Sequence, residues 1–186
     1  MFEILAGDLL GRIGRLRVRD KVAETPLFLP VINPVTQSIS ARWMKENLRA
    51  EAVITNAYII FKRLRERALE EGVHGILDFD GIIMTDSGGY QVLEYGDVEA
   101  GPEEIALFEE EIGTDIAVPL DIPTGICGRE KAEETVEKTL KNVEITLNIL
   151  RERGIRRALW AAPIQGGTHL DPVSYTHLTL PTNREV

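Results

Sequence analysis

The alternation of apolar, strand-like runs with helix-like segments is the feature that most constrains the fold of this chain. The apolar runs cover residues 27–32, 51–60, 81–86, 115–122 and 158–167. Strands that are separated by helical crossovers pair in parallel. The pattern therefore predicts an α/β fold, either an open doubly wound sheet or a (β/α) barrel.

The segments between these runs carry helix signals. Ser38 or Ser40 is a candidate N-cap for the first of them, Gly72 closes the second, and Pro102 lies in the first turn of the third. The fourth and longest has apolar residues at steps of three and four, namely Ala132, Val136, Leu140, Val143, Leu147 and Leu150. Helices are predicted over residues 39–50, 61–72, 101–113 and about 129–153.

The charge of the chain is acidic overall but uneven. Its 30 acidic and 21 basic residues give a formal net charge of −9, which taken alone argues against a nucleic-acid partner, because phosphate binding needs Lys and Arg. Basic residues nevertheless gather in three groups: Arg12, Arg15, Arg17 and Arg19; Lys62, Arg63, Arg65 and Arg67; Arg151, Arg153, Arg156 and Arg157. Such groups are most often solvated faces.

Cysteine content and the N-terminal segment point to a cytoplasmic protein. A single cysteine, Cys127, excludes an internal disulfide and a Cys-rich zinc site within this chain, and it fits a reducing compartment. No apolar run is long enough to span a bilayer. The N-terminal residues mix charges into their apolar stretch, unlike a signal peptide. We expect no membrane partner.

A carboxylate directly follows the third apolar run, in the segment GIIMTDSGGYQV. Asp86 beside a buried strand costs roughly several kcal/mol unless it is paired, hydrated or used. It can cap the turn that begins at Ser87, which is the common role of such an aspartate. Alternatively, it is a catalytic acid, base or nucleophile beside a flat ligand that the small residues admit. Tyr90 either stacks on that ligand or fills the core.

Polar residues end the fourth and fifth runs in the same way. Asp121 is either a turn residue or an acceptor for two adjacent N–H groups of a planar ring, such as a guanine-like base presents. Gln165 can donate to a carbonyl and accept from an N–H, and Gly166 after it exposes a backbone N–H unless it only makes the turn. Because parallel strands end at one edge, Asp86, Asp121 and Gln165 are predicted to line one pocket.

Five segments, in this order along the chain, resemble the tRNA-guanine transglycosylases. They are PLFLPVINP, ITNAYII, GILDFDGIIMTDSGGYQVLEYGDVE, LDIPTG and IQGG, and the resemblance extends from about Arg12 to Asp171. The YGDVE and LDIPT segments are similar to the archaeal type, which exchanges a guanine in the D-arm of tRNA for preQ0 on the route to archaeosine. The alternative is the anticodon type, which inserts a queuosine precursor or queuine.

The resemblance implies a (β/α)8 TIM barrel. This chain would contain about the first five strands, preceded by an N-terminal β extension. The resemblance also implies that Asp86 is the first catalytic aspartate and that Asp121 and Gln165 recognise the base. The other positions that it assigns to the base pocket are Ser87, Tyr90 and Gly166.

The implied chemistry swaps one purine-like base for another on a ribose C1′, with two carboxylates acting in sequence as in retaining glycosidases. The implied partners are tRNA, guanine and preQ0, with a homodimer as the complete form. No cofactor is expected in this chain. The family's second catalytic aspartate, its structural zinc site of three Cys and one His, and its RNA-binding domains lie in parts that this sequence does not match, so the chain is expected to be truncated and inactive alone.

The C-terminal segment departs from the pattern, because residues 174–186 show no helical stripe where a crossover helix is due. We expect residues 1–173 to form the partial catalytic domain and residues 174–186 to be a tail that is either foreign to the fold or flexible. Two other function classes stay open: a non-catalytic subunit that binds tRNA or a partner, and an unrelated barrel enzyme that acts on a small planar heterocycle.

Overall fold

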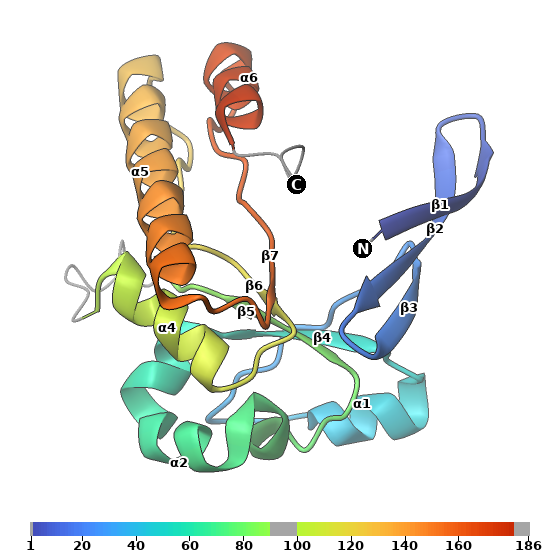
Figure 1. Ribbon diagram of the computed structural model, residues 1–186. Coiled ribbons are helices and arrows are strands. Elements are labelled where there is room, and N and C mark those ends of the chain that lie inside the picture. The colour runs from blue at the N-terminus through green and yellow to red at the C-terminus, as the bar shows by residue number, and fades with distance from the viewer. Residues whose placement is uncertain (1, 90–99, 181–186) are drawn as a thin grey trace.

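An antiparallel sheet forms the N-terminal part of the molecule. The computed structural model describes residues 2–89 and 100–180, and its first sheet has the strand order β1–β2–β3. The bounds are Phe2–Asp8 for β1, Gly11–Val18 for β2 and Lys21–Thr25 for β3. The β1–β2 hairpin projects to one side of the molecule (Figure 1). This sheet agrees with the N-terminal β extension that the resemblance implies.

A second sheet consists of four parallel strands in the order β4–β5–β6–β7, which is also their order along the chain. The bounds are Ala52–Asn56 for β4, Ile82–Asp86 for β5, Ile116–Ala117 for β6 and Leu159–Trp160 for β7. The predicted α/β class and parallel pairing are therefore confirmed. Within residues 2–89 and 100–180, this sheet does not close on itself into a barrel.

The strands are shorter than the apolar runs that predicted them. The first run contributes one parallel bridge, from Val31 to Ile54, because Pro30 has no N–H to donate to a ladder. The second run ends as a strand at Asn56, where a helix begins. Pro119 likewise interrupts the fourth run soon after β6.

Within residues 2–89 and 100–180, four of the five helices lie where the sequence predicts them. The bounds are Ala41–Leu48 for α1, Ala57–Leu77 for α2, Pro102–Glu111 for α4, Arg129–Arg153 for α5 and Leu170–Thr179 for α6. Ser40 is the N-cap of α1 and accepts a hydrogen bond from Trp43 N at 3.1 Å. Gly72 interrupts α2, as the sequence predicts: its φ of 71° and ψ of 168° are not helical, and Val73 N donates to Ile112 O at 2.8 Å. A second helical segment then continues to Leu77.

Helix α6 occupies a segment in which the sequence shows no helical stripe. Its Thr176 hydroxyl lies 2.9 Å from both Pro172 O and Gln165 O, which ties the helix to the segment after β7. α6 therefore runs across the domain boundary that we placed between residues 173 and 174. The assignment of residues 174–186 to a separate tail stays a prediction, and residues 181–186 lie outside the described part of the chain.

The main core lies between the parallel sheet and helices α2 and α4. Ile60, Leu77, Ile83 and Ile105 are among its fully buried side chains. The Phe61 ring meets Phe108 edge to face, at a centroid distance of 5.2 Å. Within residues 2–89 and 100–180, none of the helices combines the length and apolar character that crossing a lipid bilayer requires. The core fixes β4, β5 and β6, and thereby the edge at which their carboxyl ends meet.

Candidate active site

Asp86 ends β5 and is paired in register with Asn56, the last residue of β4. The Asp86 carboxylate accepts a hydrogen bond from Gly88 N at 3.1 Å, and Asn56 Nδ2 lies 3.5 Å from its other oxygen. The contact with Gly88 is the turn-capping role that the sequence left open. This turn-capping contact uses only Oδ1 of the Asp86 carboxylate. Asp86 and Asn56 also line a cavity of about 210 Å³.

Asn56 is a site residue that the sequence analysis missed. The predicted strand-like run continues past Asn56 to Ile60, although Asn is among the preferred N-cap residues and could have marked the start of a helix. Asn56 Oδ1 accepts from Ile59 N at 2.8 Å and so starts α2, while its amide nitrogen faces Asp86. One side chain thus ends the strand, caps the helix and approaches the carboxylate.

The loop after β6 packs closely on the turn after β5. The buried Ser87 hydroxyl donates to Pro119 O at 3.2 Å, so it joins these two segments. A Cβ atom at Gly89 would come within 2.3 Å of both the backbone oxygen and Oδ1 of Asp121. Only glycine fits this approach. Tyr90, which the sequence also singled out, lies outside the described residues.

Asp121 and Gln165 are in direct contact. Gln165 Nε2 donates to Asp121 Oδ2, while Gln165 Oε1 accepts from Thr124 N at 3.3 Å. The backbone N–H of Gly166 donates to Thr124 Oγ1 at 3.1 Å and is therefore already engaged. The structure thus brings together the polar residues after β6 and β7. Thr124, which joins them, was not singled out from the sequence although it lies in the LDIPTG segment.

The charge on Asp121 is unfavourable in this position. Burial raises the pKa of its carboxyl to about 6, the nearby Asp86 carboxylate adds to the rise, and the hydrogen bond from Gln165 opposes it. The Asp86 carboxylate is therefore close enough to act electrostatically on Asp121. A buried carboxyl whose pKa is raised by desolvation and by a second carboxylate is typical of functional sites.

Asp121→Asn should change how stability depends on pH. Since the folded pKa lies above the ordinary value near 4, the folded protein holds a proton that the unfolded chain releases. Stability therefore falls as the pH rises from about 4 to 6, and it stays lower above that window. The variant should gain about 1–2 kcal/mol in free energy of unfolding at pH 7 and nothing near pH 4. Urea unfolding measures this, with Asp20→Asn at an exposed site as the control. An equal gain at both pH values would contradict the assignment.

Glu109 of α4 is a second carboxyl, after Asp121, whose pKa is raised, and it is fully buried. Its Oε1 accepts a hydrogen bond at 2.6 Å from the hydroxyl of Thr85, the residue that precedes Asp86 in the chain. Its Oε2 has no hydrogen-bond partner within the described ranges. Burial raises the pKa of Glu109 well above its ordinary value, against the opposing effects of Thr85 and the nearby Val118 N–H. The buried environment therefore favours the neutral carboxylic acid form of Glu109 more than water favours it for an exposed glutamate.

Glu109→Gln should accordingly stabilise the chain at neutral pH. Folding at pH 7 requires Glu109 to take up a proton, whereas the amide is neutral in both states. We expect a gain of about 1–3 kcal/mol at pH 7 that disappears near pH 4. Chemical denaturation at the two pH values measures it, with Glu111→Gln at the exposed neighbour as the matched control. A loss of stability at pH 7 would show that Glu109 is charged in the folded state.

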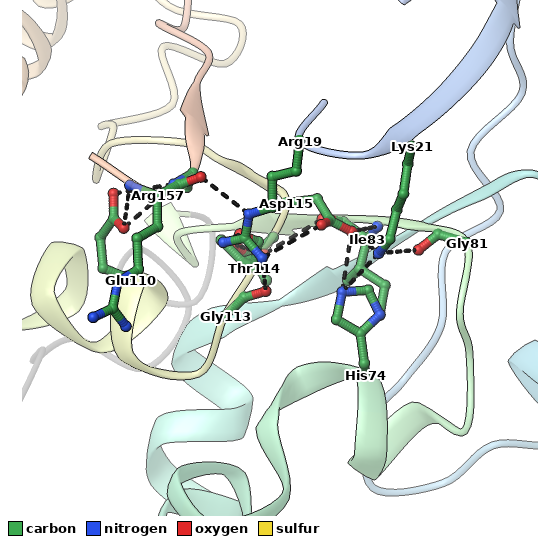
Figure 2. Close-up of polar contacts among 12 residues, drawn as sticks. Arg19, Lys21, His74, Gly81, Ile83, Glu110, Gly113, Thr114, Asp115 and Arg157 are labelled. Atoms are coloured by element: carbon green, nitrogen blue, oxygen red, sulfur yellow. Dashed lines mark hydrogen bonds and ion pairs between the residues drawn. The ribbon is translucent and has the colours of Figure 1, made fainter. Parts of the chain in front are cut away.

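A charged cluster also lies at the opposite, amino ends of the strands (Figure 2). Asp115, just before β6, is fully buried and contacts Lys21 Nζ at 2.7 Å, His74 Nε2 at 3.1 Å and Arg19 NH1 at 3.6 Å. Burial alone would raise the pKa of Asp115. Hydrogen bonds from His74, Lys21 and Ile83 N together outweigh burial, so the pKa is lowered. This cluster attaches the turn between β2 and β3 to the parallel sheet.

The described residues do not fit the structural zinc site that the resemblance implies for the complete protein. Within residues 2–89 and 100–180, no group of three or more His, Cys, Asp and Glu side chains could hold a metal ion. His169 Nε2 contacts the backbone oxygen of Cys127, the lone cysteine, at 2.9 Å, so this contact does not involve the thiol.

A parallel α/β sheet with coupled polar residues at its carboxyl edge is the arrangement of an α/β enzyme domain. The family model described as queuine tRNA-ribosyltransferase matches residues 8–177. The chain therefore belongs to the queuine tRNA-ribosyltransferase family.

Archaeal relatives support this membership. The chain is 46% identical over 176 residues to the tRNA-guanine(15) transglycosylase of Aeropyrum pernix, a match that covers 93% of this chain and 33% of the relative. It is 48% identical over 171 residues to the protein of the same name from Archaeoglobus fulgidus, covering 91% of this chain and 35% of that relative. The resemblance to the archaeal type is thus confirmed. The chain spans about a third of the length of these curated relatives.

Proposed function

We propose that this chain forms the base-recognition part of a tRNA-guanine transglycosylase, which exchanges a guanine of tRNA for a 7-deazaguanine base. The observation that carries the proposal is the direct contact of Asp121 with Gln165 beside Asp86, at the ends of neighbouring strands. The name of the archaeal relatives, tRNA-guanine(15) transglycosylase, supports a guanine at position 15 as the target. The incoming base expected from the resemblance is preQ0.

In the proposed reaction, Asp86 is the nucleophile. Its carboxylate oxygen bonds to C1′ of the ribose as the bond from C1′ to guanine N9 breaks, and the electron pair leaves with N9, which takes up a proton. The incoming base then attacks C1′ through N9, loses its N9 proton and displaces Asp86. Two inversions retain the configuration. We propose that the proton transfers fall to the second catalytic aspartate that the resemblance implies, which lies outside residues 1–186.

Asp121 and Gln165 are proposed to read the base after it leaves the RNA stack. A carboxylate can accept from N1–H and the exocyclic N–H of guanine, and an amide nitrogen can donate to O6. We propose that Ser87, Tyr90 and Gly166 complete the pocket. A TIM barrel is the architecture that we propose for the complete catalytic domain. The agreement of strand order with chain order in β4–β7 supports it.

The remaining properties concern the complete protein. We propose a homodimer that binds tRNA and holds its structural zinc through residues outside this chain. Nothing in the proposed chemistry of residues 2–180 uses that zinc.

Transfer of radiolabelled guanine into tRNA tests the proposed function. The complete protein that carries these residues should incorporate label into unmodified tRNA, and preQ0 should chase it out. Label that enters only free nucleosides would instead favour a barrel enzyme acting on small heterocycles. Binding of tRNA with no exchange in the complete protein would favour a non-catalytic subunit.

A further inference from the structure

The orientation of the Gln165 amide is fixed by the chemistry of its two neighbours. On one side, the backbone N–H of Thr124 can only donate a hydrogen bond, and it donates to Gln165 Oε1 at 3.3 Å. On the other side, the ionised Asp121 carboxylate can only accept a hydrogen bond, and it accepts one from Gln165 Nε2. An amide rotated by half a turn would oppose a donor with a donor and an acceptor with an acceptor.

Thr124 contributes its hydroxyl to the same arrangement. Thr124 Oγ1 lies 3.3 Å from Gln165 Oε1, 3.1 Å from Gly166 N and 2.9 Å from Thr135 Oγ1 of α5. Thr124 Oγ1 accepts from Gly166 N, and its single proton lies within reach of both Gln165 Oε1 and Thr135 Oγ1, because the Thr135 proton is donated to Ala132 O. Thr135 also lies 2.9 Å from Ala132 O in its own helix, so the network is anchored in α5. Thr124 is itself buried.

We propose that Thr124 is the positioning residue that makes this site select a base with a ring carbonyl over one with an amino group at the same position. The proposal rests on the proposed function, since it concerns the base that Asp121 and Gln165 would read. Thr124 holds Oε1 away from the base, so the amide presents N–H.

The hydrogen-bonding edge of guanine matches the arrangement. Guanine presents an acceptor at O6, then donors at N1 and the exocyclic amine. An amide nitrogen has two protons, so Gln165 can donate to Asp121 and to O6 together, while Asp121 accepts from the two donors. 2,6-Diaminopurine instead presents a donor, an acceptor and a donor, which opposes N–H with N–H at the Gln165 position. Binding it requires the amide to turn against Thr124.

The test compares binding of guanine and 2,6-diaminopurine to the complete protein by calorimetry. The wild type should bind guanine more tightly. Thr124→Val keeps the backbone N–H and the side-chain shape but removes the hydroxyl, and it should shrink the preference about fivefold, as one neutral hydrogen bond would. Thr124→Ser should restore the preference. Thr146→Val is the matched control, because Thr146 is a buried α5 threonine whose hydroxyl has no partner within the described residues.

Each outcome bears on one claim. A reduced preference in Thr124→Val alone, restored in Thr124→Ser, supports the proposal. An unchanged preference in Thr124→Val, or the same loss in Thr146→Val, overturns it and leaves the proposed function standing. A wild type that does not bind guanine contradicts the proposed function itself.

Discussion

Guanine exchange into tRNA is expected to fall by about 10⁴-fold or more when Asp86 of the complete protein is replaced by asparagine, as for other catalytic nucleophiles. Asparagine keeps an oxygen that can accept from Gly88 N, so the turn-capping contact at 3.1 Å survives. It removes the charge that would attack C1′. The substitution therefore separates the two roles that the sequence left open for this residue.

The measurement is initial-rate incorporation of radiolabelled guanine, with circular dichroism to show that the variant is folded. Asp78→Asn is the matched control, because Asp78 is exposed and caps α2 in the left-handed conformation, which asparagine also tolerates. It should exchange at the wild-type rate. A folded Asp86→Asn variant with near wild-type exchange would show that Asp86 is only a turn residue.

Asp115→Ala is expected to cause the largest loss of stability, about 2–4 kcal/mol in free energy of unfolding at neutral pH, because it removes the buried acceptor shared by Ile83 N and the partly exposed Lys21 ammonium. The carboxylate is fully buried between Lys21 and His74 and also accepts from Ile83 N at 2.9 Å. Its lowered pKa means that the contribution is present above the ordinary pKa of aspartate. The contribution is lost as the pH falls through the folded value.

Urea unfolding of the chain at pH 7 measures this loss. Glu71→Ala removes the exposed pair with Arg67, and it should leave the free energy of unfolding nearly unchanged, because water screens an exposed ion pair. The two variants therefore contrast a buried with an exposed ion pair. If Asp115→Ala were as mild as Glu71→Ala, the cluster at the amino ends of the strands would not hold the N-terminal sheet in place.

The helices were the part of the fold that the sequence predicted best, because their signals are local. α5 has the predicted bounds, Arg129–Arg153, since its apolar stripe and the following Gly154 act within a few residues. Strand bounds depend on partners that a single sequence does not reveal. The strand residues before Asn56 and the helical residues after it are both apolar, so the N-cap preference of Asn56 was the one local sign of the boundary.

The site was predicted in outline but not in its connections. Asp86, Asp121 and Gln165 stood out as polar residues at the ends of apolar runs, and that reasoning needs only the parallel topology. The roles of Asn56 and Thr124 arise from contacts across β4–β5 and across the loops after β6 and β7. Such contacts depend on tertiary packing. Sequence separation alone could not predict that Gly166 N–H donates to Thr124.

The most direct test of the account is a crystal structure of the complete protein soaked with guanine. We predict the base against the joined pair of Asp121 and Gln165, with N1–H and the exocyclic amine on the carboxylate, O6 on the amide nitrogen, and N9 directed toward Asp86. Guanine bound elsewhere, or bound with N9 facing away from Asp86, would contradict a shared base-exchange site at the ends of these strands.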